Sequence, residues 1–215
     1  MIELFMRNFS LIAIILLAIT ISPLRSNAGP LDDVGSWQKG LTSATAKFKQ
    51  EKRNVLLGKT MRSKGTVSYK PDAGVRWVYD GQMVVVYDGA KLYMHYTELG
   101  EADVIEDAGG FIGPLAFDVE RLKSDYDLLA VPTDSGGVTL TLTPRKRMPF
   151  ERMVMSFQKG SPFPSEVTMR ESTGDATTIR FDSVKLNREL DPSLFTFTAP
   201  KGVKLRHRKS IDGGQ

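Results

Sequence analysis

The chain has 215 residues, of which 41% are hydrophobic and 25% are charged, so it can bury the core of one ordinary domain and is not a disordered chain. It contains no cysteine, which excludes structural disulfides, thiolate catalysis, cysteine-ligated zinc and lipid attachment at a cysteine. The formal net charge of +4 is mild, so it permits acidic partners without requiring them.

The first 28 residues predict a secretory signal peptide. Arg7 precedes an apolar run of 13 residues from Phe9 to Ile21, and Ser26 and Ala28 supply small residues at the minus-three and minus-one positions. This run is shorter than the about 20 residues that span a bilayer. We expect export, a mature chain that begins near Gly29, and no nucleic-acid partner; an uncleaved anchor is the alternative.

A short helix and two strands are expected next. Val34, Trp37 and Leu41 recur at helical spacing, which predicts an amphipathic helix over residues 31–43. A strand is expected from about residue 44, and a second one over residues 61–70. Gly65 lies in the middle of the second strand and predicts a bulge or a bend there.

Residues 68–96 predict an antiparallel meander of three strands. Two Asp-Gly pairs, at residues 80–81 and 88–89, separate alternating apolar runs, which is a strong hairpin signal. Val75, Trp77 and Tyr79 fall on one face of the first strand. His95 alternates with Met94, so it faces away from the apolar side, and we interpret it as a structural or solvent-facing histidine.

The segment after residue 104 changes character. Glycines precede a cluster of apolar residues, and a helix is expected near residues 115–123. A glycine-rich hinge beside an apolar helical turn suits a movable lid, but a plain connecting helix buried on the core fits the pattern as well.

The remaining elements are regular. Strands are expected over residues 126–131, 138–143, 153–157, 167–169 and 179–187, followed by a short element at residues 194–197. Residues 206–215 are expected to form a polar tail. About 10 to 11 strands and a few helices predict a mainly β fold with helices (α+β), in which one strongly curved antiparallel sheet holds helices on its concave side.

Signals for catalysis are weak. The two histidines, His95 and His207, are far apart, and no nucleophile elbow, zinc-protease or phosphate-binding motif is present. Asp103, Glu106 and Asp107 cluster, and we interpret them as a solvated surface, with a carboxylate-pair hydrolase as the alternative. We therefore expect no catalytic residues, no metal and no cofactor. The many methionines on predicted strands suit either an adaptable apolar surface or ordinary core filling.

Five motifs occur in order along the chain. They are FKQEK at residues 48–52, YKPDAGVRWVY at 69–79, VVYDGAKLYMHY at 85–96, LTLTP at 140–144 and FTFTAPKGVKL at 195–205. Together they resemble the LolA family of periplasmic lipoprotein carriers. The resemblance implies an incomplete, strongly curved antiparallel β-barrel, in which helices form a lid over an apolar cavity. Residues 29–205 would form this carrier domain.

The resemblance also implies a function and partners. The protein would be a monomeric, non-enzymatic carrier in the periplasm that binds the acyl chains of lipoproteins or a similar lipid. It would receive cargo from an inner-membrane ABC lipoprotein exporter and pass it to an outer-membrane lipoprotein receptor. An envelope-sensing or other lipid-binding module on the same fold is the alternative.

Site residues follow from the same resemblance. Lys70 stands where the family has an arginine that latches the lid, a departure that removes the planar fork of donors. Val75 stands near a family aromatic that affects cargo release, which is another departure. The predicted cavity lining comprises Val75, Trp77, Tyr79, Met94, Leu115, Phe117, Leu140, Leu142, Met153 and Met155.

Overall fold

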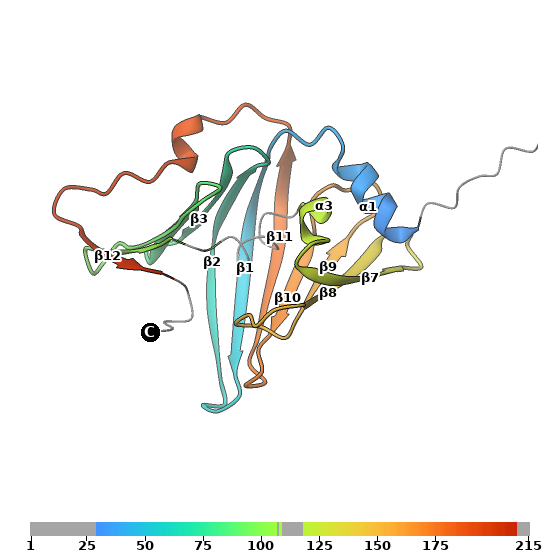
Figure 1. Ribbon diagram of the computed structural model, residues 1–215, viewed down its shortest axis with the longest axis horizontal. Helices are drawn as coiled ribbons and strands as arrows, with labels where there is room; N and C mark the ends of the chain where they lie inside the picture. The colour runs from blue at the N-terminus through green and yellow to red at the C-terminus, as the bar shows by residue number, and fades with distance from the viewer. Residues whose placement is uncertain (1–28, 107, 109–117, 210–215) are drawn as a thin grey trace, which may run out of the picture.

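A computed structural model describes residues 29–106, 108 and 118–209 of the chain (Figure 1). Its strands form one 12-stranded sheet in the order β12-β6-β5-β4-β3-β2-β1-β11-β10-β9-β8-β7. The elements are α1 (Pro30–Gln38), β1 (Ala44–Asn54), β2 (Lys59–Lys70), β3 (Gly74–Tyr79), β4 (Met83–Tyr87), β5 (Leu92–Tyr96), β6 (Glu101–Ile105), α3 (Val119–Leu122), β7 (Tyr126–Pro132), β8 (Val138–Pro144), β9 (Arg152–Phe157), β10 (Glu166–Arg170), β11 (Ala176–Leu186), the 3₁₀-helix η2 (Pro192–Phe195) and β12 (Lys204–Arg208).

The sheet is curved and open, as the sequence predicted, with β12 and β7 at its two edges. Neighbouring strands run antiparallel except β12, which pairs with β6 in parallel. Alternate residues of most strands are buried on the concave side, where they form one continuous core. The meander forms β3, β4 and β5, and its two Asp-Gly pairs occupy the turns between them.

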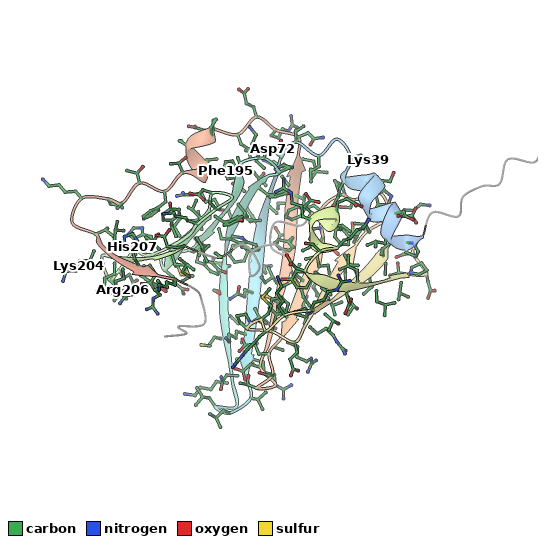
Figure 2. All side chains as sticks on the ribbon, viewed as in Figure 1. Lys39, Asp72, Phe195, Lys204, Arg206 and His207 are labelled. Atoms are coloured by element: carbon green, nitrogen blue, oxygen red, sulfur yellow. The ribbon has the colours of Figure 1, made fainter. Side chains whose placement is uncertain are left out.

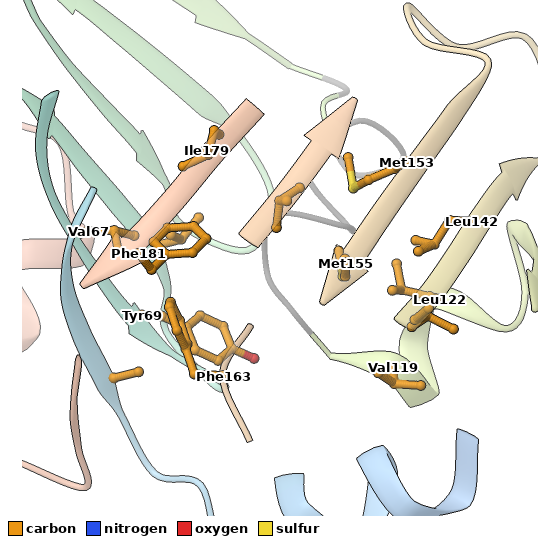
Figure 3. Packing of buried hydrophobic residues seen from close by; sticks show 14 of the residues in the cluster. Val67, Tyr69, Val119, Leu122, Leu142, Met153, Met155, Phe163, Ile179 and Phe181 are labelled. Atoms are coloured by element: carbon orange, nitrogen blue, oxygen red, sulfur yellow. The ribbon is translucent and has the colours of Figure 1, made fainter. Parts of the chain in front are cut away.

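The helices lie on the concave side near β7, β8 and β9 (Figure 1). The helix α1 begins after Gly29, whose N–H donates to Asp32 Oδ2 at 2.9 Å, and ends at Gln38. It is shorter than the predicted helix over 31–43 because Gly40 adopts a left-handed backbone with φ of +83°. Val119 and Leu122 of α3 are buried in the same core, and Leu122 lies beside Leu142 of β8 (Figure 3).

Gly65 does not form the predicted bulge. It pairs in register with Phe48 of β1 and Tyr79 of β3, while the irregularity of β1 lies between Thr45 and Lys47 against β11. A Cβ at position 65 would lie 1.9 Å from the carbonyl oxygen of Val78. Glycine therefore permits the close approach of two strands at this position.

The outer face of β3–β5 is covered by the segment around η2. Phe195 is buried, Arg76 Nη1 donates to the carbonyl of Leu194 at 3.3 Å, and the ring of Phe197 stacks on Tyr93 at 5.1 Å. His95 lies 6.0 Å from the same Phe197 ring. The contact confirms the interpretation of His95 as facing away from the apolar side of the meander.

The C-terminal boundary differs from the prediction. Residues 206–208 belong to strand β12 at the edge of the sheet and not to a polar tail, as Figure 2 shows for Arg206 and His207. Their polar character hid the strand because both faces of β12 are exposed and ion pairs hold it to β6. About 10 to 11 strands were predicted, and with β12 the sheet has 12.

Candidate functional site

An apolar cavity of about 170 Å³ lies within the concave side of the sheet. It is lined by residues of β1, β3, β4, β5, β10 and β11, namely Gln50, Val75, Trp77, Tyr79, Met83, Val85, Leu92, Met94, Met169 and Ile179. None of these side chains is charged. The cavity can therefore hold apolar groups.

An aromatic cluster supports one wall of this cavity. The ring of Phe48 makes edge contacts with Trp77 and Tyr79, each at a centroid distance of 5.0 Å, and Trp77 lies 5.8 Å from Phe181. Such contacts are worth about 0.5–1.5 kcal/mol each beyond area burial. The wall is therefore rigid on the β1–β3 side, whereas Met83, Met94 and Met169 supply flexible side chains elsewhere.

Two polar side chains of the lining hydrogen-bond to each other. Tyr79 Oη donates to Gln50 Oε1 at 3.1 Å. Burial raises the pKa of Tyr79 to about 12, so its phenol stays neutral at physiological pH. The cavity therefore contains this neutral hydrogen-bonded pair among mainly apolar side chains.

The structure divides the predicted cavity residues into three groups. Val75, Trp77, Tyr79 and Met94 line the cavity together. Leu140, Leu142, Met153 and Met155 are fully buried in the continuous core, where Leu142 lies beside Leu122 of α3 in Figure 3. Leu115 and Phe117 lie outside the described residues.

Sequence reasoning missed six of the ten residues that line the cavity. Met83 and Val85 share the inward face of β4, and they lie opposite Tyr79 and Trp77 on β3. Pairing β4 with β3 across the Asp-Gly turn would have found them, because side chains directly opposite each other share a face. Met169 and Ile179 come from β10 and β11, and no local pattern relates those strands to the meander.

The predicted latch residue Lys70 is the half-buried last residue of β2. It pairs with Gly74, and its carbonyl accepts from the N–H of Ala73 at 3.1 Å in the tight connection to β3. The first residues of the predicted lid lie outside the described part of the chain, so the latch stays a prediction.

The helices are joined by Gln38 of α1. Its Nε2 donates to the carbonyl of Pro162 at 3.3 Å, and its Oε1 accepts from the N–H of Val119 at 3.1 Å. One side chain thus connects α1, the start of α3 and the loop before β10. Among the described residues, no helix is long and apolar enough to cross a membrane.

A larger groove of about 430 Å³ lies between these helices and the end of β2. Its lining includes Asp32, Asp118 and Glu120 together with Lys39. Carboxylates in such a wall disfavour an alkyl chain, because burying an ionised group without a partner is costly. The smaller apolar cavity is therefore the better candidate for a lipid site.

Asp103 is not the solvated surface residue that its sequence neighbourhood predicted. Its side chain is only 4% exposed, and Oδ1 accepts from Arg206 Nε at 2.8 Å. Arg208 Nε lies 3.4 Å from Oδ2, which also accepts from Tyr96 Oη at 3.4 Å. The hydrogen bond to Asp103 raises the pKa of the Arg206 guanidinium. This carboxylate holds the edge strand β12 and is not among the residues that line the cavity.

Buried tyrosines predict a loss of stability at alkaline pH. Burial raises the pKa of Tyr69, Tyr79 and Tyr126 above the ordinary value of 10, with nearby Asp118 adding to the effect at Tyr69. The unfolded chain releases these protons first, so the stability they contribute is complete below pH 10 and falls as pH rises toward 12. Urea unfolding between pH 8 and pH 12 measures this fall.

The matched variant is Tyr126→Phe, which removes one of the three phenols and keeps the ring. We expect its unfolding free energy to decline less steeply above pH 10 than that of the wild type, because one proton fewer is released on unfolding. Equal slopes for the two proteins would show that Tyr126 titrates normally in the folded state.

The fold and the site together define a class of protein in which one open antiparallel sheet curves around an apolar cavity. A model of the LolA family, described as outer membrane lipoprotein carrier protein LolA, matches residues 39–198. This match covers well over half of the chain. The chain belongs to the LolA family.

Relatives agree with this assignment. The outer-membrane lipoprotein carrier protein of Dechloromonas aromatica (strain RCB) is 28% identical over 188 residues, covering 84% of this chain and 89% of the relative. The protein of the same name from Nitrosomonas europaea is 22% identical over 199 residues, covering 90% and 96%. An uncharacterized conserved protein from Thermus thermophilus shares the fold, with a TM-score of 0.51, 15% identity and coverage of 83% and 97%.

Proposed function

We propose that the protein is a periplasmic carrier that shields the acyl chains of lipoproteins on their way from the inner to the outer membrane. The observation that carries this proposal is the uncharged apolar cavity inside the sheet of a LolA-family chain. Each methylene removed from water is worth about 0.8 kcal/mol, so acyl chains do not cross an aqueous space unaided. Shelter and release are sufficient, and no covalent step is required.

The cavity must widen to receive cargo. Its volume of about 170 Å³ is close to that of an engineered cavity of about 150 Å³ that binds benzene, and a lipoprotein acyl chain is considerably larger. Three features favour widening: the flexible side chains of Met83, Met94 and Met169, the short helix α3, and the open edges at β7 and β12. No hydrogen bonds between strands join those two edges, so the sheet can change its curvature without breaking the pairing of any two strands.

The route of the cargo follows from its chemistry. We propose that an inner-membrane ABC lipoprotein exporter loads the carrier and that an outer-membrane receptor with higher affinity accepts the acyl chains. The carrier is exported, and its first 28 residues are removed as a signal peptide. Lys70 is the proposed latch, which would hold the helices closed over the loaded cavity.

The test is competition for the cavity. A fluorescent fatty-acid probe bound to the mature protein is expected to be displaced by a synthetic triacylated lipopeptide and not by the same peptide without acyl chains. Equal displacement by both peptides, or no binding of the probe, would exclude the proposal. In cells, depletion of a carrier leaves lipoproteins in the inner membrane, whereas loss of an envelope sensor leaves their sorting intact.

A further inference from the structure

The hairpin between β1 and β2 carries a cluster of exposed apolar side chains. Val55, Leu56 and Leu57 in its turn are 49%, 92% and 66% exposed, and Met61 at the start of β2 is 56% exposed. Figure 1 shows this hairpin extending beyond the rest of the sheet, with the β10–β11 turn beside it. An apolar cluster of this kind on a soluble domain is a candidate contact surface. We call residues 52–62 the tip hairpin.

Basic side chains surround the apolar tip on both faces of the hairpin. Lys52 lies two residues after Gln50 on β1, so both side chains are on the concave face. Lys59 of β2 is on the same face, because it pairs with Asn54, which lies two residues after Lys52. Arg53 and Arg62 lie on the opposite face. Residues 47–64 hold seven basic residues and one acidic residue, a formal charge of +6, whereas the whole chain carries +4.

The nearby carboxylates are already engaged. Glu171 pairs with Lys52 at 3.0 Å, and Glu51 pairs with Arg62 at 2.9 Å. Arg53 and Lys59 are exposed and make no ion pair with a described residue. Two cations on opposite faces of the tip hairpin are therefore free to meet an anionic surface.

Backbone N–H groups of the turn donate hydrogen bonds within the protein, which suits a less polar environment. The N–H of Val55 donates to Asp175 Oδ1 at 2.9 Å, and that of Leu57 donates to Asn54 Oδ1 at 2.7 Å. The N–H of Gly58 donates to the carbonyl of Val55 at 3.3 Å. Amide groups that are satisfied inside the protein cost less to bring near hydrocarbon. Asn54 Nδ2 also donates to Asp175 Oδ2 at 2.7 Å, which fixes the tip to the β10–β11 turn.

We propose that the tip hairpin docks the protein on an anionic phospholipid bilayer, with Leu56 and Leu57 inserted at the headgroup boundary and Arg53 and Lys59 bound to lipid phosphates. A narrow convex tip with cations on both faces fits a deformable lipid surface, whereas a protein partner would have to offer a matching apolar pocket. Interfacial binding of this kind combines buried apolar area with attraction to anionic lipids.

The docked orientation has a consequence for cargo. Gln50 on β1 lines the cavity and lies five residues before Val55 in the turn, a distance of about 16 Å along an extended chain. A bilayer bound at the tip would therefore lie close to the cavity end of β1. The inference itself does not depend on cargo, because the free mature protein has the same tip.

The first experiment measures insertion directly. The chain has no cysteine, so Leu56→Cys gives one labelling site for an environment-sensitive fluorophore. We expect a blue shift and quenching by nitroxide lipids with phosphatidylcholine vesicles that contain phosphatidylglycerol. The matched control is Leu99→Cys, at a residue 69% exposed in the β5–β6 turn and flanked by Glu98 and Glu101, which is expected to show neither.

The second experiment tests the cations. The double variant Arg53→Gln and Lys59→Gln is expected to lose about 25-fold in vesicle affinity, about fivefold for each cation. Arg147→Gln, at an exposed arginine far along the chain, is expected to change it little. Thermal unfolding should be the same for all three proteins because these side chains are exposed.

Three results would overturn the proposal. They are an absent shift at position 56 with anionic vesicles, an equal shift at position 99, and unchanged affinity of the double cation variant. A shift at position 56 that depends on protein concentration without vesicles would assign the tip to a second copy of the chain instead. Because the protein is tested without cargo, failure here leaves the carrier proposal untouched, and failure of acyl competition leaves this one untouched.

Discussion

Gly65→Ala is expected to destabilise the protein by at least about 3 kcal/mol, one of the largest effects of a single methyl group on this fold. The added Cβ would lie 1.9 Å from the carbonyl oxygen and 2.9 Å from the carbonyl carbon of Val78, and 3.0 Å from Cε1 of Phe48. The carbonyl belongs to the backbone of β3, so the strand itself must move. Urea unfolding followed by circular dichroism measures the change in unfolding free energy.

Gly81→Ala is the matched control. Gly81 has a φ of +70°, so alanine is strained there, but no atom lies within 4 Å of the added Cβ. We expect a cost of about 1 kcal/mol from the backbone alone. Similar costs for the two variants would show that β3 adjusts freely around Gly65.

The sequence was sufficient to predict features that depend on neighbours in the chain. The Asp-Gly pairs define two hairpins, and the alternation of Val75, Trp77 and Tyr79 defines one inward face, because turn preference and side-chain period are local properties. The curved open sheet followed from the number of half-polar strands and from the resemblance to the LolA family.

Features that depend on distant partners were predicted wrongly or not at all. Asp103 can be buried because it pairs with Arg206. That arginine lies 103 residues further along the chain, so the sequence near residue 103 does not predict the pair. Gly65 permits a close approach to β3, but the sequence shows only a glycine in a strand. In both cases the decisive neighbour comes from a strand whose place in the sheet is set by the fold.

The division of the predicted site has the same origin. Leu140 and Leu142 alternate in the same way as Val75 and Trp77, and both pairs point to the concave side. The difference is that Leu142 packs near α3, whereas Val75 and Trp77 border the cavity. Strand periodicity tells which side a residue faces, but it cannot tell whether a helix fills the space in front of it.

Val85→Phe is expected to lower the affinity for a fluorescent acyl probe at least about tenfold without destabilising the fold. Val85 lines the cavity between Trp77 and Met94, its direct neighbours across β3 and β5, and is only partly buried. A phenyl ring there occupies space that at least two methylenes of a bound chain would need, each worth about 0.8 kcal/mol. The ring also fills part of the cavity, so the melting temperature should stay the same or rise.

Val84→Phe separates this effect from a general disturbance of β4. Val84 is the preceding residue, faces the outer side of the sheet opposite His95, and is also partly buried. We expect its acyl-probe affinity to equal that of the wild type, because the added ring lies outside the cavity. If Val85→Phe melts at a higher temperature and still binds the probe normally, the ring fills the cavity without competing with the ligand. Acyl chains would then bind elsewhere on the concave side, and the buried residues near α3 become the next positions to substitute.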